Sequence, residues 1–155
     1  MVLDVCPPIP AEKRVLEIAV ERTHKWAIRG RNHFLLREKS FENERAQFGI
    51  IQGGLDPKLR QISAEQIVEI GFDGYAIGGL SVGETRQEMI EPMQISADAL
   101  PKQQPRYFMG LGDPAGLVEA IACGVDMFDC VWPTRLARHG TALTMQGRVN
   151  LGAAR

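Results

Sequence analysis

The residues from Val125 to Arg135 combine the side chains that are best suited to chemistry in this chain. The stretch follows a predicted helix end at Cys123-Gly124, and its apolar residues predict a short buried strand. That strand would carry the carboxylate of Asp129 to its C-terminal end. A charge at such a place is costly unless it is paired or used, and the carboxyl ends of parallel strands are where α/β enzymes keep their reactive groups. Asp129 is therefore a candidate functional carboxylate, with an ion pair to Arg135 as the structural alternative.

Four other predicted strands also end in residues of unusual chemistry, namely Asp4, Gln52, Gly78-Gly79 and Met109. Each has an ordinary structural explanation when it is taken alone. An aspartate can cap a turn, a double glycine is most often a turn, and a methionine at a strand end is most often part of the core. Their recurrence at the same end of successive strands favours a shared site instead.

This combination suits a flat purine such as guanine. The carboxylate of Asp4 can accept two parallel N–H bonds, which matches the N1–H and the exocyclic amine of guanine. The amide of Gln52 and a backbone N–H beside the glycines can donate to the carbonyl oxygen of the base. Gly79 would let the base approach the main chain closely, and Met109 offers a polarizable surface to the ring. Such a site rejects adenine by ~10⁴ or more, because the wrong base leaves buried polar groups unpaired.

The elements that must position these residues follow a repeated strand–helix order, which produces parallel sheets. Apolar runs bounded by glycine and proline predict strands that begin near positions 2, 47, 74, 106 and 126. Asp73 and Asp126 each lie at the beginning of a predicted strand, where capping explains them. Helical periodicity and caps predict a long helix over 11–39, a helix start at Asp56-Pro57 and a second helical piece over 64–70 capped by Ser63. They also predict a helix over 85–100, bent or divided at Pro92, and a helix from Pro114 to Ala122. Residues 142–151 are predicted to form a hairpin that turns at Gln146-Gly147.

Composition bounds the class of protein. The chain has 155 residues, of which 45% are hydrophobic, enough for one globular domain with a real core. Its formal charge of −1 means that any polyanion must be held by local patches. Cys6, Cys123 and Cys130 lack CxxC or CxH spacing, so we expect no metal site in this segment alone, and their odd number fits a reducing compartment. No apolar run reaches membrane-spanning length, and the first residues, Met-Val-Leu-Asp, are not the start expected of a basic leader. We expect a cytoplasmic α/β domain without a membrane partner.

Length leaves two α/β folds open. A (β/α)₈ barrel needs ~250 residues, of which this chain would supply about five of the eight units. A flavodoxin-like doubly wound sheet also has five strands, and length alone favours that open sheet. Its phosphate loop should follow the first strand, however, and Cys6-Pro7-Pro8 cannot form one.

The chain resembles the tRNA-guanine transglycosylases, the bacterial queuine type in particular. The resemblance runs from about Met1 to Arg138, with the motifs in the order and spacing of that family. The matching motifs are Asp4-Val5-Cys6-Pro7, Phe48-Gly49-Ile50-Ile51-Gln52-Gly53-Gly54, the run from Gly71 to Glu84, Tyr107-Phe108-Met109-Gly110-Leu111-Gly112, and the run from Asp126 to Arg135.

The resemblance implies a fold and an activity. The fold would be the TIM (β/α)₈ barrel, here an incomplete barrel of about five βα units over residues 1–155. The activity would be exchange of guanine at the tRNA wobble position for a 7-deazaguanine, either 7-aminomethyl-7-deazaguanine or queuine, through a covalent aspartyl-ribosyl intermediate. Asp129 would be the nucleophile. Base recognition would fall to Asp4, Gln52 and the Gly79–Leu80 main chain, with Met109 stacked on the ring, while Arg135 and Arg138 would hold the anticodon loop.

The resemblance also implies parts that this segment lacks. The missing parts are three barrel strands, a second catalytic aspartate and an aromatic stacking partner before Met1, and a Cys/His zinc site after Arg155. We therefore expect no cofactor in this chain, a homodimer only in the intact form, and a polypeptide that is inactive or marginally folded alone. Two other readings stay open. One is a non-catalytic accessory subunit, against which Asp129 and Asp4 count. The other is the archaeal branch, against which the Gly78-to-Glu84 run and the two arginines count.

Overall fold

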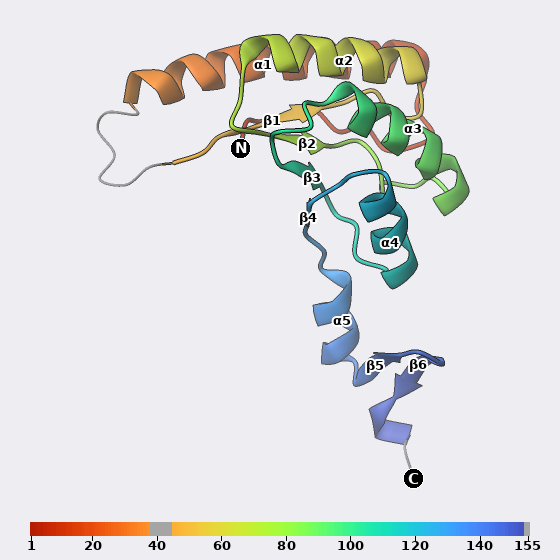
Figure 1. Cartoon of the computed structure of the whole chain (residues 1–155). Coiled ribbons are helices and arrows are strands. Elements are labelled where there is room, and N and C mark those ends of the chain that lie inside the picture. The colour runs from red at the N-terminus through yellow and green to blue at the C-terminus, as the bar shows by residue number, and fades with distance from the viewer. Residues whose placement is uncertain (38–44, 154–155) are drawn as a thin grey trace.

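The computed structural model describes residues 1–37 and 45–153, and it shows an α/β fold built on a parallel sheet (Figure 1). The sheet has the strand order β1-β2-β3-β4, and every neighbouring pair is parallel. The register pairs Phe48 with Gly74, Tyr75 with Arg106, and Tyr107 with Met127. The strands are β1 (Phe48–Ile51), β2 (Gly74–Ile77), β3 (Arg106–Phe108) and β4 (Met127–Phe128).

Four helices connect or precede these strands, and most begin at a side-chain cap. Asp56, Thr85 and Asp113 each accept a backbone N–H of the following first turn, and Thr85 forms a full capping box with Glu88. The helices are α1 (Lys13–Arg37), α2 (Pro57–Ile70), α3 (Arg86–Ala99) and α4 (Pro114–Ala122). Residues 38 and 39, the last of the predicted first helix, lie outside the described residues.

The helices neighbour one another in the same order as the strands, with α1 beside α2, α2 beside α3, and α3 beside α4 (Figure 1). Because the strand order never reverses, right-handed crossovers place all the connecting helices on one face of the sheet. A flavodoxin-like sheet requires a reversal of strand order and helices on both faces. The strand order therefore contradicts the flavodoxin-like alternative.

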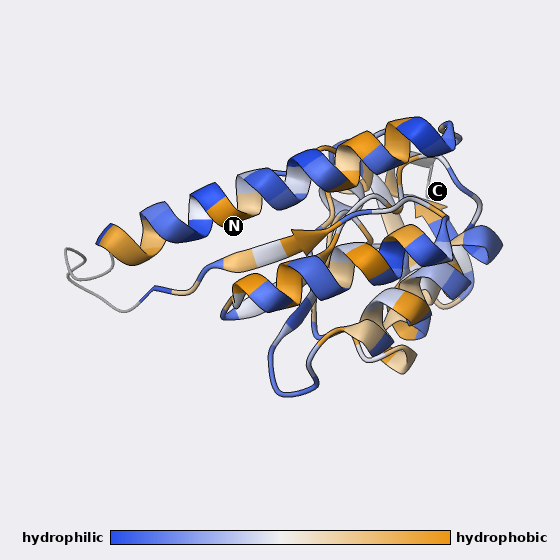
Figure 2. Cartoon of the chain, turned by 90° about the horizontal axis from the view of Figure 1, so that it is seen from above, coloured by the Kyte–Doolittle hydropathy of each residue, from blue (hydrophilic) through white to orange (hydrophobic). Residues whose placement is uncertain are grey.

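The hydrophobic core lies between the sheet and this helix layer. Figure 2 shows apolar bands along α1 and α2, which run on either side of β1. The strand residues at the centre of the core are fully buried, and so are the helix residues that pack on them: Ile50, Ile51, Ile77, Phe108, Ile67 and Met93. Burial of this apolar surface is the main force that holds the strand ends in place.

The structure differs from the sequence predictions at the first and last strands. Residues 2–4 form no strand, since they make one backbone bond to the sheet, from Val2 N to Phe48 O at 3.0 Å. The prolines Pro7 and Pro8 that follow have no N–H to extend a ladder. The strand predicted at the Asp129 motif is only two residues long and partly exposed, because β4 is the edge of the described sheet.

One helix is more continuous than the sequence predicts, and another stays undivided at the proline where the sequence predicts a bend or a division. Residues 57–70 form one helix, because the Ser63 hydroxyl accepts a bond from Gln52 N at 2.9 Å and caps no second piece. Helix α3 also stays undivided at Pro92. Its capping box and the buried Met89 and Met93 hold it on both sides of the proline.

Beyond β4 the chain leaves the sheet as an arm, visible at the bottom of Figure 1. It contains α5 (Trp132–Arg138), which the sequence analysis did not predict, the antiparallel hairpin β5 (Thr141–Thr144) and β6 (Gly147–Asn150), and a short 3₁₀ helix (Leu151–Ala153). The predicted hairpin turn at Gln146-Gly147 is confirmed to within one residue. None of the helices in the described ranges is both long enough and apolar enough to cross a membrane.

Candidate active site at the carboxyl ends of the strands

A cavity of about 350 Å³ lies at the carboxyl ends of the strands, and five of the predicted site residues line it. They are Asp4, Gly79, Leu80, Met109 and Asp129. Gly79 and Leu80 follow the end of β2, Met109 follows β3, and Asp129 follows β4. The shared end of the parallel strands brings Gly79, Leu80, Met109 and Asp129 together, and the N-terminal segment, which forms no strand, adds Asp4.

Gln52 lies behind this cavity rather than in its lining. It is fully buried, and its Nε2 donates to Asp4 Oδ2 at 2.6 Å. One of its two amide N–H groups, which the sequence analysis assigned to a base carbonyl, is therefore directed to the Asp4 carboxylate. Its Oε1 has no hydrogen-bond partner among the described residues. A Cβ at Gly79, where φ is +67°, would overlap this oxygen, so the position accepts only glycine.

The Asp129 carboxylate is held through one oxygen. Oδ1 accepts bonds from the Tyr107 hydroxyl at 2.5 Å and from Gly110 N at 3.0 Å. Oδ2 accepts none from the part of the chain that the structure describes, and the side chain is exposed to the cavity. A carboxylate anchored at one oxygen and open at the other has the geometry of an oriented nucleophile.

Tyr107 is a site residue that the sequence analysis missed. It lines the cavity and donates to Asp129. Burial raises the pKa of Tyr107 to about 12, and the hydrogen bond and negative charge of Asp129 act in the same direction. The phenol is therefore a donor at neutral pH. The sequence could have predicted this role. Tyr107 and Met109 are two residues apart, and alternate residues of a strand share a face.

Cys6 also lines the cavity. Partial burial raises the pKa of its thiol, and the nearby Asp4 carboxylate raises it further. A thiol with a raised pKa is a poor nucleophile at neutral pH, which supports a lining role for Cys6.

Glu84 is a second residue that the sequence analysis did not single out. Its carboxylate accepts the backbone N–H groups of Ser81 and, at 3.0 Å, of Val82. Ser81 has a φ of +60°, an uncommon value for a residue other than glycine. Both bonds hold the loop after β2 in this conformation at the rim of the cavity.

Arg135 and Arg138 do not reach the cavity lining. Both lie on α5, which has no buried residue, and both are exposed. Next to them, the guanidinium of Arg148 stacks over the Trp132 ring at 4.9 Å and ties β6 to α5. The predicted nucleophile and the predicted anticodon contacts thus belong to two separate surfaces, the cavity and the arm.

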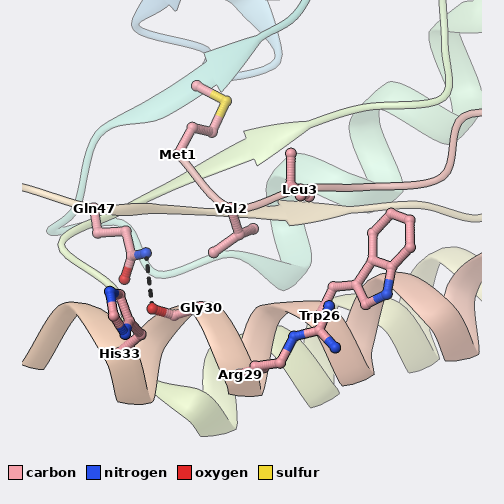
Figure 3. Close-up of a pocket in the computed structure, with 8 residues that line it drawn as sticks. All are labelled: Met1, Val2, Leu3, Trp26, Arg29, Gly30, His33 and Gln47. Atoms are coloured by element: carbon pink, nitrogen blue, oxygen red, sulfur yellow. Dashed lines mark hydrogen bonds between the residues drawn. The ribbon is translucent and has the colours of Figure 1, made fainter.

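A second cavity, of about 400 Å³, lies between the N-terminal segment and α1, near the amino end of β1 (Figure 3). The apolar side chains in its lining are those of Met1, Val2, Leu3 and Trp26. Its lining contains no carboxylate and no thiol, so the carboxylate nucleophile predicted from the sequence does not lie there. Within residues 1–37 and 45–153, no group of three or more His, Cys, Asp or Glu side chains could hold a metal ion.

Comparison with known proteins identifies the family of this chain. The sequence model of the family described as queuine tRNA-ribosyltransferase matches residues 1–155. A queuine tRNA-ribosyltransferase of Thermotoga neapolitana is 53% identical over 154 residues, which are 99% of this chain and 40% of that protein. Proteins of the same name from Halothermothrix orenii and Solidesulfovibrio magneticus are each 49% identical, over 97% and 99% of this chain and 39% and 40% of theirs. The chain thus spans about two fifths of the length of these relatives, and it belongs to the queuine tRNA-ribosyltransferase family.

Proposed function

We propose that this chain is the part of a tRNA-guanine transglycosylase that holds the departing guanine and supplies the nucleophile. The observation that carries the proposal is the common cavity of Asp4, Gly79, Leu80, Met109 and Asp129. The substrate would be the anticodon loop of a tRNA, and the incoming base a 7-deazaguanine. The cytoplasm would be the place of action, which suits the free thiols of all three cysteines.

In the proposed complex the base lies between the ends of the strands. Asp4 would accept the N1–H and amine protons, the main-chain N–H groups of Gly79 and Leu80 would donate to the carbonyl oxygen, and Met109 would contact the ring. The base must first leave the RNA stack to reach this depth. Exposed Arg135 and Arg138 on the arm would hold the loop by its phosphates.

The proposed reaction is a double displacement. Oδ2 of Asp129 attacks the ribose C1′ through an oxocarbenium-like state and forms an ester, while the C1′–N bond breaks and its electron pair leaves with guanine. The departed guanine takes up a proton from solvent at the freed ring nitrogen. The incoming deazaguanine gives up its ring N–H proton to solvent, attacks C1′ through that nitrogen and displaces the carboxylate, so that no net proton is gained or lost. The hydrogen bonds to Oδ1 from Tyr107 and Gly110 orient Asp129 for both steps. We propose that this step requires no metal, because the carboxylate supplies the nucleophile.

We further propose that the four-stranded sheet is a segment of a (β/α)₈ barrel. Strands in sequential order, with helices on one face, are the arrangement that closes into such a barrel. The remaining strands, and the zinc site expected of the family, would lie in the three fifths of the relatives that this chain does not match.

The nucleophile assignment is tested in a graft, in which residues 1–155 replace the matching segment of the Thermotoga neapolitana relative. With tRNA and no incoming base, the graft should form a covalent RNA adduct that survives denaturing electrophoresis. Asp129→Ala should abolish the adduct, because the other carboxylate in the lining, Asp4, is bonded by Gln52 and not by Tyr107 and Gly110, which orient Asp129. Asp126→Ala, which changes an aspartate just before β4, is the matched control and should leave the adduct intact. Undiminished adduct in Asp129→Ala would remove Asp129 from this role.

A further inference from the structure

A fully buried arginine, Arg60 of α2, joins the loops that follow β1 and β2. Its Nε donates to Gly54 O at 2.8 Å, its Nη1 to Gly78 O at 2.6 Å, and its Nη2 to Gly79 O at 2.9 Å. No carboxylate within the described ranges forms an ion pair with it. Arg60 is thus a buried cation whose hydrogen-bond partners are main-chain carbonyl groups, two of them in the turn beside the candidate site.

Such a residue is costly to keep, because burial removes the hydration of its charge. Burial lowers the pKa of Arg60 to about 9, while Glu84 and Cys6 act in the opposite direction. The guanidinium therefore stays charged at neutral pH. Its bonds to three carbonyl groups compensate part of the lost hydration, because bonds from a charged donor are stronger than neutral ones.

The bonds to Gly78 and Gly79 determine where the neighbouring N–H groups point. The C=O and N–H groups of a planar trans peptide point in opposite directions. With the carbonyls of Gly78 and Gly79 directed at Arg60, the N–H groups of Gly79 and Leu80 point away from it. The Gly79 main chain acts to lower the pKa of the Cys6 thiol, which is consistent with its N–H facing Cys6, and Cys6, Gly79 and Leu80 all line the cavity. Both N–H groups are therefore presented on the cavity side of the turn.

We propose that Arg60 is a positioning residue of the base site, which orients the Gly79 and Leu80 N–H groups toward the cavity and so selects a base with a carbonyl oxygen at that place. The proposal rests on the proposed function for the identity of the ligand, a guanine-type base. The positive charge also polarises the two peptide groups and strengthens their N–H groups as donors. Arg60 itself touches no base, because the turn lies between it and the cavity.

A purely structural clamp is the alternative, and Arg106 supplies the comparison. Arg106 is also buried, and its guanidinium also donates to main-chain carbonyls, those of Leu100 at 2.7 Å and Gly124 at 3.3 Å. It lies at the beginning of β3, at the opposite end of the sheet from the cavity. Substitution of either arginine leaves buried carbonyl groups without a donor, so stability alone does not distinguish them.

The test compares Arg60→Met and Arg60→Lys with Arg106→Met and Arg106→Lys in the chain. Three quantities are measured: the unfolding temperature, the deuterium uptake of residues 78–82, and the Kd values for guanine and for adenine. We expect Arg60→Met to raise uptake in residues 78–82, to raise the Kd for guanine at least tenfold and to leave that for adenine unchanged. Arg60→Lys keeps the charge but loses the planar fork, so its effects should be intermediate. The Arg106 variants should lower the unfolding temperature without changing either uptake at 78–82 or guanine binding.

The outcomes separate this proposal from the proposed function. Unchanged uptake at 78–82 in both Arg60 variants overturns the positioning role, whether or not guanine binds. Increased uptake in a chain whose wild type binds no guanine supports the positioning role and counts against guanine as the ligand. If neither Arg60 variant folds, the guanidinium N–H protons of the wild type decide the question. Protection of these protons from solvent exchange, with a shift of their resonances on addition of guanine, supports the role, and rapid exchange overturns it.

Discussion

At the scale of single residues, the site depends on how each carboxylate is held. Asp129 is anchored at Oδ1 by Tyr107 and Gly110, whereas Asp4 receives a bond from the buried Gln52. The different hydrogen-bond partners of the two carboxylates suit them to different roles. A phenol and a main-chain amide leave the second oxygen of Asp129 available. The neutral amide that bonds Asp4 leaves its charge without an ion pair to any cation among the described residues. These are the requirements of a nucleophile and of an acceptor for N–H groups, respectively.

The contact between Tyr107 and Asp129 predicts a shifted titration. Asp129→Asn should lower the pKa of Tyr107 from about 12 toward its ordinary value of 10.0, but not fully, because burial is the largest cause of the shift. Since the folded chain holds this proton more tightly than the unfolded chain, the phenol favours folding below pH 10, and that contribution is lost as the pH rises through about 12. Ultraviolet titration of the two tyrosines checks this. Asp126→Asn should leave the titration unchanged, and an equal effect of both variants would contradict the assignment.

At the scale of elements, aspartates just before the strands connect neighbouring strands. Asp73 Oδ2 accepts the backbone N–H of Gln47 at 2.8 Å, and Asp126 Oδ2 accepts that of Arg106 at 2.9 Å. Each aspartate precedes one strand and bonds the beginning of the strand beside it. The capping role that the sequence analysis assigned to both residues is confirmed. These bonds hold neighbouring strands together at the amino ends of the sheet, while the candidate site residues lie at the carboxyl ends.

Loss of such a bond should destabilise the sheet without touching the site. Asp126→Ala should lower the free energy of unfolding by about 1 kcal/mol, because the N–H of Arg106 loses its acceptor. Asp126→Asn keeps an oxygen acceptor and should cost less. Chemical denaturation measures both values. Equal losses in the two variants would show that the charge of Asp126, rather than its hydrogen bond, matters for stability.

At the scale of the whole molecule, the described sheet is open at β4. Met127 of this strand is 45% exposed, and β4 pairs only with β3 among the described strands. In a closed barrel the next strand would cover this edge, and an open apolar edge is a template for pairing with another chain. Beyond this edge the arm with α5 projects from the sheet (Figure 1).

The open edge predicts self-association of the chain. Met127→Lys should reduce light scattering at high concentration, because a charged lysine on an edge strand opposes pairing with a second copy. Met145→Lys is the matched control, since Met145 is 97% exposed at the hairpin turn, away from the edge. If the two variants reduced scattering equally, net charge rather than the β4 edge would explain the effect.

Local patterns in the sequence determined the order of elements and the end of the sheet that holds the site. Hydrophobic periodicity, glycine and proline positions, and caps such as Asp56 and Asp113 depend on residues close together in the chain, so they can be read without a fold. The polar residues that follow each strand converge for the same reason, because parallel strands share one carboxyl end. The extent of β4 was not predictable in this way, since a strand's length depends on a partner along both of its edges.

Only the tertiary structure decided how the site residues are held. Arg60 has the helical spacing of the buried Ser63, Ala64 and Ile67, so its position in the sequence places it on the buried face of α2. The sequence analysis did not use this spacing, because arginine side chains are rarely fully buried. Its partners lie 6, 18 and 19 residues away in other segments, and Tyr107 meets Asp129 across 22 residues. A hydrogen bond requires atoms within about 3 Å, and distances of that precision are established when the core packs, not by the spacing of residues along the chain.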